Sequence, residues 1–196
     1  YGTSITQGAS ASRPGLFYSN IISRELNCEI LNYGFSGNAN LEDQVARIIF
    51  RNKNIDLIII DDEANAGMSD NLVNRLDRFY QVIKENGIDI PVIIVSRTPF
   101  AQDKFDELIS NKNKTNKKYL REFSNKYNLN YLDGTLFFNN DDNGRAIDGV
   151  HQNDLKMNEI ATCFIKYIKD NNFNHLKLSW IKLEKSYKNK TVKNNY

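Results

Sequence analysis

The sequence has few of the residues that build disulfide frameworks and zinc sites. Only two of its 196 residues are cysteine and two are histidine, and neither Cys28 nor Cys163 belongs to a Cys-x-x-Cys or Cys/His pattern. We therefore expect no disulfide framework. The acidic run at 61–63 has no histidine or second acidic cluster arranged to complete a metal site, so the sequence predicts no bound metal.

An excess of charge of one sign is missing as well. The 26 Lys and Arg residues are nearly balanced by 24 Asp and Glu, which leaves a net charge of +2 and gives no indication of a nucleic-acid partner. No apolar run approaches the length of a membrane span. With 40% hydrophobic and 26% charged residues, the composition predicts one globular domain.

The positive charge that remains gathers at the C-terminal end. Six lysines follow Asn172, against the single acidic residue Glu184. We therefore divide the chain into a domain of residues 1–171 and a basic tail, rich in Asn and Lys, of residues 172–196.

Short apolar segments alternate with longer amphipathic ones along the domain. This alternation predicts a parallel sheet with right-handed crossovers, which is an α/β fold of three layers with helices on both faces of the sheet. Reactive groups in such folds collect beyond the carboxyl ends of the strands. The predicted strands are 29–34, 55–61, 90–96 and 129–134, and the predicted helices are approximately 15–27, 41–52, 70–87, 113–127 and 154–170.

Two polar motifs stand where such groups are expected. Asp148 precedes His151 by three residues in a turn that leads into the last helix, and this spacing allows a carboxylate to fix the tautomer of the imidazole. Ser4 lies in the glycine-flanked segment GTSITQG, before the first helix. Alone, the first motif also fits a surface pair, and Ser4 also fits a helix cap.

Two further loops offer hydrogen-bond donors for a developing oxyanion. Gly37, in GFSGNAN, can bring its backbone N–H close to a ligand because it has no side chain. Asn65, in DDEANAG, offers a side-chain amide. A turn-forming glycine and an Asx-turn asparagine are the alternative interpretations.

Taken together in this order and spacing, Ser4, Gly37, Asn65 and the Asp148/His151 pair resemble the four blocks of the SGNH hydrolases, also called GDSL esterases. The resemblance covers nearly the whole chain to about residue 170. The segments GTSITQG, GFSGN and DGVH are similar to those of a bacterial branch whose first block reads G-[ST]-S-I-T-Q-G. The resemblance implies a flavodoxin-like sandwich with about five parallel strands, and ester hydrolysis without a metal or cofactor.

The resemblance also implies a role for each residue. Ser4 would be the nucleophile, His151 its general base, and Asp148 the residue that orients His151. The backbone N–H groups of Ser4 and Gly37 and the side-chain amide of Asn65 would form the oxyanion hole.

The chain departs from the family pattern at two positions. Thr3 replaces the usual aspartate before the serine, and the third block, usually Gly-x-Asn-Asp, reads EANA here. The second departure places Glu63 near the site.

The expected substrate is a small-molecule or glycan ester, with an O-acetyl or short-acyl group on a carbohydrate as the leading interpretation. No long apolar lid is present to receive a lipid acyl chain. The alternatives are a lipase or thioesterase, a glycan acyltransferase, and an inactive carbohydrate-binding relative. Four residues are candidate substrate contacts, although each also fits a surface or structural position: Arg13, Asn38, Glu63 and Arg97.

The implied fold has a central strand leading into the serine, between the strands at 29–33 and 55–61. We expect residues ahead of Tyr1 to form it, as part of a longer polypeptide with an upstream domain. The alternative within the chain is the alternating segment HLKLSWIKL, whose lysines would then be buried. The compartment is left open.

Overall fold

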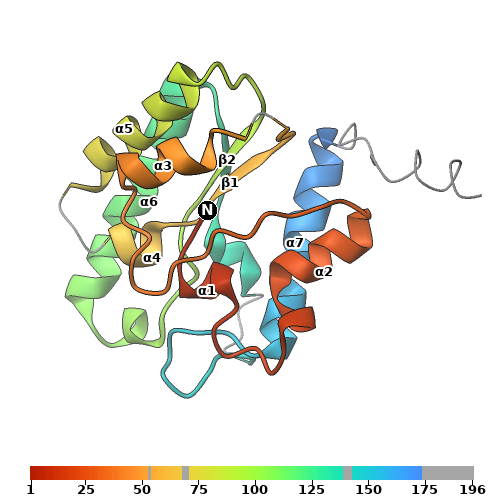
Figure 1. The fold of residues 1–196 in the computed structure, drawn as a ribbon. Helices are drawn as coiled ribbons and strands as arrows, with labels where there is room; N and C mark the ends of the chain where they lie inside the picture. Colours follow the sequence, from red (N-terminus) through yellow and green to blue (C-terminus); the bar gives the residue numbers. More distant parts are fainter. Residues whose placement is uncertain (53, 68–70, 139–142, 174–196) are drawn as a thin grey trace, which may run out of the picture.

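The computed structural model describes residues 1–52, 54–67, 71–138 and 143–173, so the basic tail and the segment HLKLSWIKL lie almost wholly outside the described residues. Three short strands and seven α-helices alternate along the described chain (Figure 1). The strands are β1 (Ile58–Ile60), β2 (Val92–Val95) and β3 (Asn130–Leu132). The helices are α1 (Ser4–Gln7), α2 (Tyr18–Leu26), α3 (Asp43–Ile49), α4 (Glu63–Ala66), α5 (Leu72–Glu85), α6 (Glu107–Tyr127) and α7 (Asp154–Asp170), with 3₁₀ turns η1 (Pro14–Leu16), η2 (Ala101–Lys104) and η3 (Gly134–Phe137).

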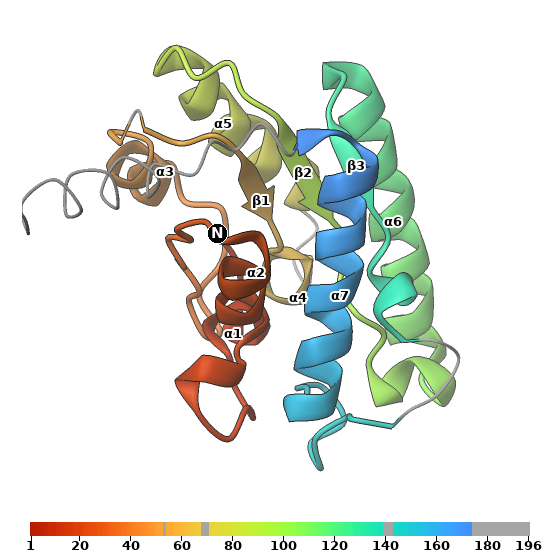
Figure 2. The same ribbon diagram turned by 90° about the vertical axis from the view of Figure 1, so that its right-hand side faces the viewer.

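The strands form a parallel sheet in the order β1-β2-β3. Helices α3, α5 and α6 cover one face, and α2 and α7 cover the other (Figures 1 and 2). Successive side chains of a strand point to opposite faces of the sheet. Ile60 and Ile94 therefore pack in the core under α3, α5 and α6, while Ile93 and Val95 pack in the core under α2 and α7. The predicted three-layer α/β fold is confirmed.

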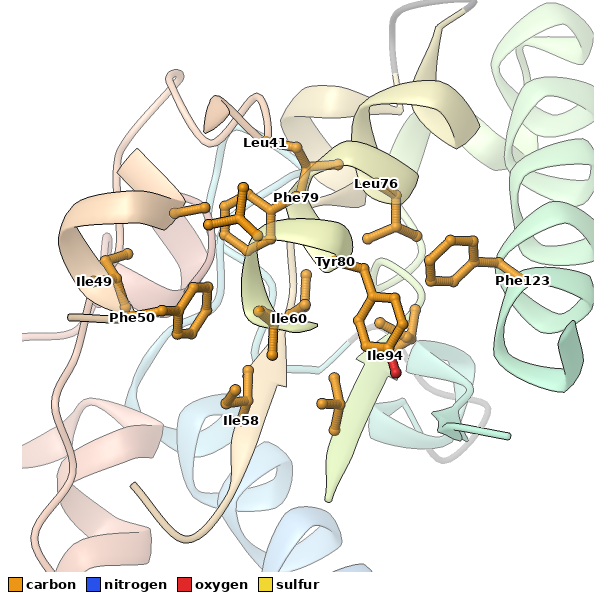
Figure 3. Close-up of a cluster of buried hydrophobic side chains, with 14 of the residues drawn as sticks. Leu41, Ile49, Phe50, Ile58, Ile60, Leu76, Phe79, Tyr80, Ile94 and Phe123 are labelled. Atoms are coloured by element: carbon orange, nitrogen blue, oxygen red, sulfur yellow. The ribbon is translucent and has the colours of Figure 1, made fainter. Parts of the chain in front are cut away.

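Aromatic rings fill much of the core beneath α3, α5 and α6 (Figure 3). Phe79 of α5 is fully buried and meets the ring of Phe50 edge to face, with centroids 5.7 Å apart. Tyr80 meets Phe123 of α6 in the same way, at 6.0 Å. On the opposite face, Tyr18 of α2 stacks on Phe164 of α7. The burial of large aromatic rings in both helical layers stabilises the packing of these helices on the two faces of the sheet.

Several helix boundaries differ from the prediction for local reasons. Helix α6 begins at Glu107 rather than near 113, because the Asp106 side chain caps it by accepting hydrogen bonds from two backbone N–H groups. Helix α2 begins at Tyr18 rather than 15, because Pro14–Leu16 forms a separate 3₁₀ turn. None of the helices in the described part of the chain is long and apolar enough to cross a membrane.

The predicted strand at 29–34 and the count of about five strands are wrong for the described residues. Only Gly34 of that segment pairs, in an isolated parallel bridge with Gly2, which also bridges Asp61. The amino group of Tyr1 donates to the carbonyl oxygen of Ile59, 2.9 Å away. Tyr1 and Gly2 therefore lie between the 29–34 segment and β1, and the pairing of the described residues there is limited to isolated bridges.

Candidate active site

Three side chains from distant parts of the sequence form a continuous chain of hydrogen bonds. Oγ of Ser4 lies 2.7 Å from Nε2 of His151, although 147 positions separate them in sequence. On the other side of the ring, Nδ1 of His151 lies 2.5 Å from Oδ2 of Asp148. The structure therefore brings together the three residues that the sequence motifs group.

A short, tightly packed helix holds Ser4 beyond the end of the sheet. Ser4 is the first residue of α1, which Thr3 caps through its side chain and which ends at Gly8 in the left-handed conformation. The neighbouring loop passes so close that a Cβ added at Gly34 would lie 2.3 Å from the backbone nitrogen of Gln7. This close approach holds α1, and Ser4 with it, against the loop that contains Gly34.

Asp148 both builds the turn that carries His151 and orients its ring. Its Oδ1 accepts the backbone N–H groups of Val150, at 2.9 Å, and His151, at 3.0 Å, while its Oδ2 accepts the ring N–H. Gly149 supplies the positive φ of 73° that the turn requires. The hydrogen bond from His151 is the main cause that lowers the pKa of Asp148 to about 2, so this carboxylate is ionised at neutral pH.

The candidate oxyanion donors come from three neighbouring elements. The Oδ1 atom of Asn65 accepts the backbone N–H of Ala39 at 3.3 Å, which assigns the Nδ2 group as the free donor of that amide. Gly37 lies in an exposed turn with φ of 69°. The N–H of Ser4 is among those at the start of a helix that have no intrahelical acceptor. Helices α1 and α4, which carry Ser4 and Asn65, lie side by side (Figures 1 and 2).

The sequence of the whole domain matches a known family. The model of the GDSL-like Lipase/Acylhydrolase family matches residues 1–169. The chain belongs to this family. The matched region includes every loop described above, and no curated protein matches the chain.

Solved structures share the same fold. A protein from Bacteroides ovatus described as a GDSL-like lipase is 27% identical, with a TM-score of 0.78 over 87% of this chain and 51% of its own. The salicylyl-acyltransferase SsfX3 is 18% identical, with a TM-score of 0.75 over 88% of this chain and 53% of its own. A two-domain esterase active on acetylated mannans is 16% identical, with a TM-score of 0.65 over 91% of this chain and 49% of its own. This GDSL-family chain thus spans about half the length of these three proteins.

The four candidate substrate contacts lie in two different environments. Arg13 and Asn38 are exposed on the loops after α1 and around Gly37. Glu63 and Arg97 are buried, with 1% and 4% of their surfaces exposed, and they line a cavity of about 230 Å³ beside α6. The Arg97 guanidinium is directed to Asp103, whose carboxylate oxygens lie 2.8 and 2.6 Å from two of its nitrogens. The Glu63 carboxylate is likewise directed inward, to the backbone of Arg97.

A buried polar network that the sequence motifs do not predict lies behind Ser4. Asp61 accepts hydrogen bonds from Thr6 of α1, at 3.1 Å, and from the hydroxyl of Tyr18 of α2, at 3.3 Å. The Tyr18 hydroxyl also lies 2.9 Å from Oγ1 of Thr6. The network ties α1 to the end of β1, and the position of Asp61 directly after a buried strand was the signal that could have indicated it.

The acidic run at 61–63 is buried. Burial is the main cause that raises the pKa of Asp62 to about 8 and that of Glu63 to about 7. Neither carboxylate oxygen of Asp62 has a hydrogen-bond partner among the described residues. Within the same residues, no group of three or more His, Cys, Asp or Glu side chains is arranged to hold a metal ion.

Proposed function

We propose that this GDSL-family chain is a serine ester hydrolase that works through an acyl-enzyme. The observation that carries the proposal is the 2.7 Å contact between Oγ of Ser4 and Nε2 of His151, with the Asp148 carboxylate on the other ring nitrogen. A serine hydroxyl is a weak nucleophile unless a base within hydrogen-bond reach removes its proton, and this arrangement supplies that base. Ser4, His151 and Asp148 are therefore the proposed catalytic residues.

In the first half of the proposed reaction, Oγ of Ser4 attacks the ester carbonyl carbon while Nε2 of His151 takes the hydroxyl proton. The ionised Asp148 holds the proton on Nδ1, which leaves the lone pair on Nε2, and it stabilises the imidazolium that forms. The tetrahedral intermediate collapses as His151 gives its proton to the leaving alcohol. In the second half, His151 takes a proton from water as the water oxygen attacks the acyl carbon. The second tetrahedral intermediate then collapses as His151 returns that proton to Oγ of Ser4, which releases the acid and regenerates the free serine.

The negative charge of the tetrahedral intermediate needs donors already in place. We assign this role to the backbone N–H groups of Ser4 and Gly37 and to the Nδ2 group of Asn65. The hydrogen bond from Ala39 to Oδ1 of Asn65 fixes the amide before substrate arrives, so little reorganisation is needed during reaction.

The proposed substrate is an acetyl or other short-acyl ester of a carbohydrate. The exposed Arg13 and Asn38 provide polar groups on nearby loops. One protein of the same fold is described as active on acetylated mannans, and acetylated mannans are therefore suitable first substrates.

The domain division and the branch assignment are part of the same proposal. We assign the hydrolase to residues 1–171 and leave the basic residues 172–196 outside it. The first block GTSITQG favours the bacterial branch to which it is similar.

The test is hydrolysis of p-nitrophenyl esters of increasing chain length and of acetylated sugars, with Ser4→Ala as the blank. Ser110→Ala, a serine of α6, is the matched control. We expect activity on acetyl esters in wild type and control, and its loss in Ser4→Ala. Equal turnover by Ser4→Ala would contradict the nucleophile, and a preference for long acyl chains would favour the lipase interpretation.

Acyl transfer is the second candidate, because an acyltransferase shares this fold. Water and a sugar hydroxyl attack the same acyl-enzyme, so the two reactions use identical residues. Adding an acceptor sugar to the assay distinguishes them: a transferase releases an acylated acceptor in place of free acid.

A further inference from the structure

Glu63 is a buried carboxylate that has no direct part in the proposed chemistry. It is the first residue of α4, two positions before Asn65, and 1% of its surface is exposed. Its Oε2 accepts the backbone N–H of Arg97, the second residue after β2, at 2.8 Å. The carboxylate therefore joins the helix of an oxyanion donor to the segment that follows the next strand.

The segment reached by Glu63 is itself held rigidly. The Arg97 guanidinium binds both carboxylate oxygens of Asp103 and the carbonyl oxygen of Thr98, and it lies 3.9 Å from the centre of the Phe100 ring. Asp103 also accepts the backbone N–H of Phe100 at 2.7 Å. Because Arg97 and Asp103 are both largely buried, this two-point ion pair closes residues 97–103 into a fixed loop.

The loop that carries His151 rests on residues 98–101. The backbone N–H of Ala101 donates to the carbonyl oxygen of Gly149 at 2.8 Å. Nε2 of Gln152, which is fully buried and adjacent to His151, donates to Oγ1 of Thr98 at 3.1 Å. The position of the general base thus depends on the same segment that Glu63 holds.

From these contacts we infer that Glu63 is a positioning residue: it sets the placement of the oxyanion donor Asn65 relative to the base His151 by joining α4 to the 97–103 loop. The inference rests on the proposed function. Glu63 does not touch the reacting atoms, and its effect passes through the two elements that it joins. Displacing such groups by about 1 Å costs on the order of 100-fold in rate.

The charge of Glu63 strengthens the connection. Its hydrogen bond to Arg97 is charge-assisted while the carboxylate is ionised, and weaker once it is protonated. The groups that face it are Asp62 beside it on the chain, Arg97 after β2, Tyr131 of β3, and Asn116 and Lys117 of α6. Burial raises the pKa of Glu63 to about 7, and its hydrogen bond to Arg97 and the charges of Arg97 and Lys117 lower it in part. The protonation of Glu63 therefore changes near neutral pH.

The test compares Glu63→Ala and Glu63→Gln with Phe123→Leu, a core substitution near the C-terminal end of α6 that destabilises the fold away from both elements. For Glu63→Ala we expect kcat to fall by about 10–100-fold with KM within about twofold. Glu63→Gln keeps an acceptor for the Arg97 N–H and should retain kcat within about threefold at pH 8, with a shallower loss of kcat below pH 7 than wild type. Phe123→Leu should lower Tm and leave kcat unchanged.

A loss confined to KM would indicate substrate contact and overturn the inference. So would a kcat for Glu63→Ala no lower than that of Phe123→Leu. If Ser4→Ala is inactive while Glu63→Ala is fully active, the proposed function stands and only the positioning role fails. If no ester is hydrolysed, NMR decides: the Asn65 side-chain amide and His151 ring signals must shift in Glu63→Ala and not in Phe123→Leu, and unshifted signals refute the role.

Discussion

Replacing Asp62 with asparagine should stabilise the protein above neutral pH and have little effect under acidic conditions. The Asp62 side chain is completely inaccessible, and neither carboxylate oxygen has a hydrogen-bond partner among the described residues. Burial first, and then the charges of Glu63 and Asp61, raise its pKa from 3.8 to about 8. Asparagine has nearly the same shape as the protonated acid and cannot ionise, so the variant isolates the cost of the charge.

The sign and size follow from the pKa values in the two states. A folded-state pKa above the unfolded value contributes stability that is complete below pH 4 and is lost as the pH rises through about 8. Since one pKa unit corresponds to about 1.4 kcal/mol, the rise from 3.8 to about 8 gives the loss an upper limit of roughly 6 kcal/mol of unfolding free energy. Relaxation and water entry around the ionised group will reduce this, and we expect about 2–4 kcal/mol at pH 9.

The assay is urea unfolding of wild type and Asp62→Asn at pH 5 and pH 9. Asp89→Asn, at a fully exposed carboxylate, is the matched control. We expect Asp62→Asn to be only slightly more stable than wild type at pH 5, about one pH unit above the unfolded pKa, and clearly more stable at pH 9. A constant difference between the two proteins across this range would refute the reasoning, because it would mean that Asp62 does not ionise in a buried position.

Three further substitutions test the site and its support. Asn65→Ala should lower kcat by about 10²–10³ with a smaller effect on KM, since the amide serves mainly the transition state; unchanged kcat in a folded variant would make Asn65 a turn residue. Asp148→Asn should lower kcat by about 10³–10⁴, and because the pKa of Asp148 is held near 2, wild-type activity measured down to pH 4 should show no loss attributable to this group. Tyr18→Phe removes the hydroxyl that contacts Asp61 and Thr6, and urea unfolding should register a loss of about 1–2 kcal/mol.

Apolar runs and helical periodicity were sufficient to predict most of the sheet and its layers. The runs at 55–61 and 90–96 contain β1 and β2, because strands buried on both faces must be almost continuously apolar. The segment at 29–34 carries similar residues and does not form a strand, since pairing depends on a neighbour that composition cannot reveal. The early start of α6 depends on Asp106, whose capping role becomes visible only with its hydrogen bonds.

The order of the motifs along the chain was sufficient to predict which site residues lie close together. Whether a charged side chain faces the substrate or the protein interior depends on its burial, which the sequence does not reveal. Ser4 and His151 follow elements whose ends share one edge of the sheet, so the fold class alone brings their loops together. Glu63 and Arg97 stand in the same loops, and nothing in the sequence distinguishes a charge that faces a substrate from one that bonds inward. The hydrogen bonds of Asp61 could not be predicted from the sequence either, because its partners Thr6 and Tyr18 lie on two separate helices.

The two oxygens of the Asp148 carboxylate bind different partners, and this restricts which residues and spacings can replace the Asp148–His151 motif. One carboxylate oxygen accepts hydrogen bonds from the backbone of the turn, and the other accepts one from the imidazole. The fixed distance between the two oxygens therefore limits the conformations that the loop can adopt. A glutamate keeps the charge, yet its extra methylene cannot satisfy both partners at once. An insertion between Asp148 and His151 separates the two tasks altogether. The spacing of three residues between Asp148 and His151 is therefore what allows one carboxylate to make both contacts.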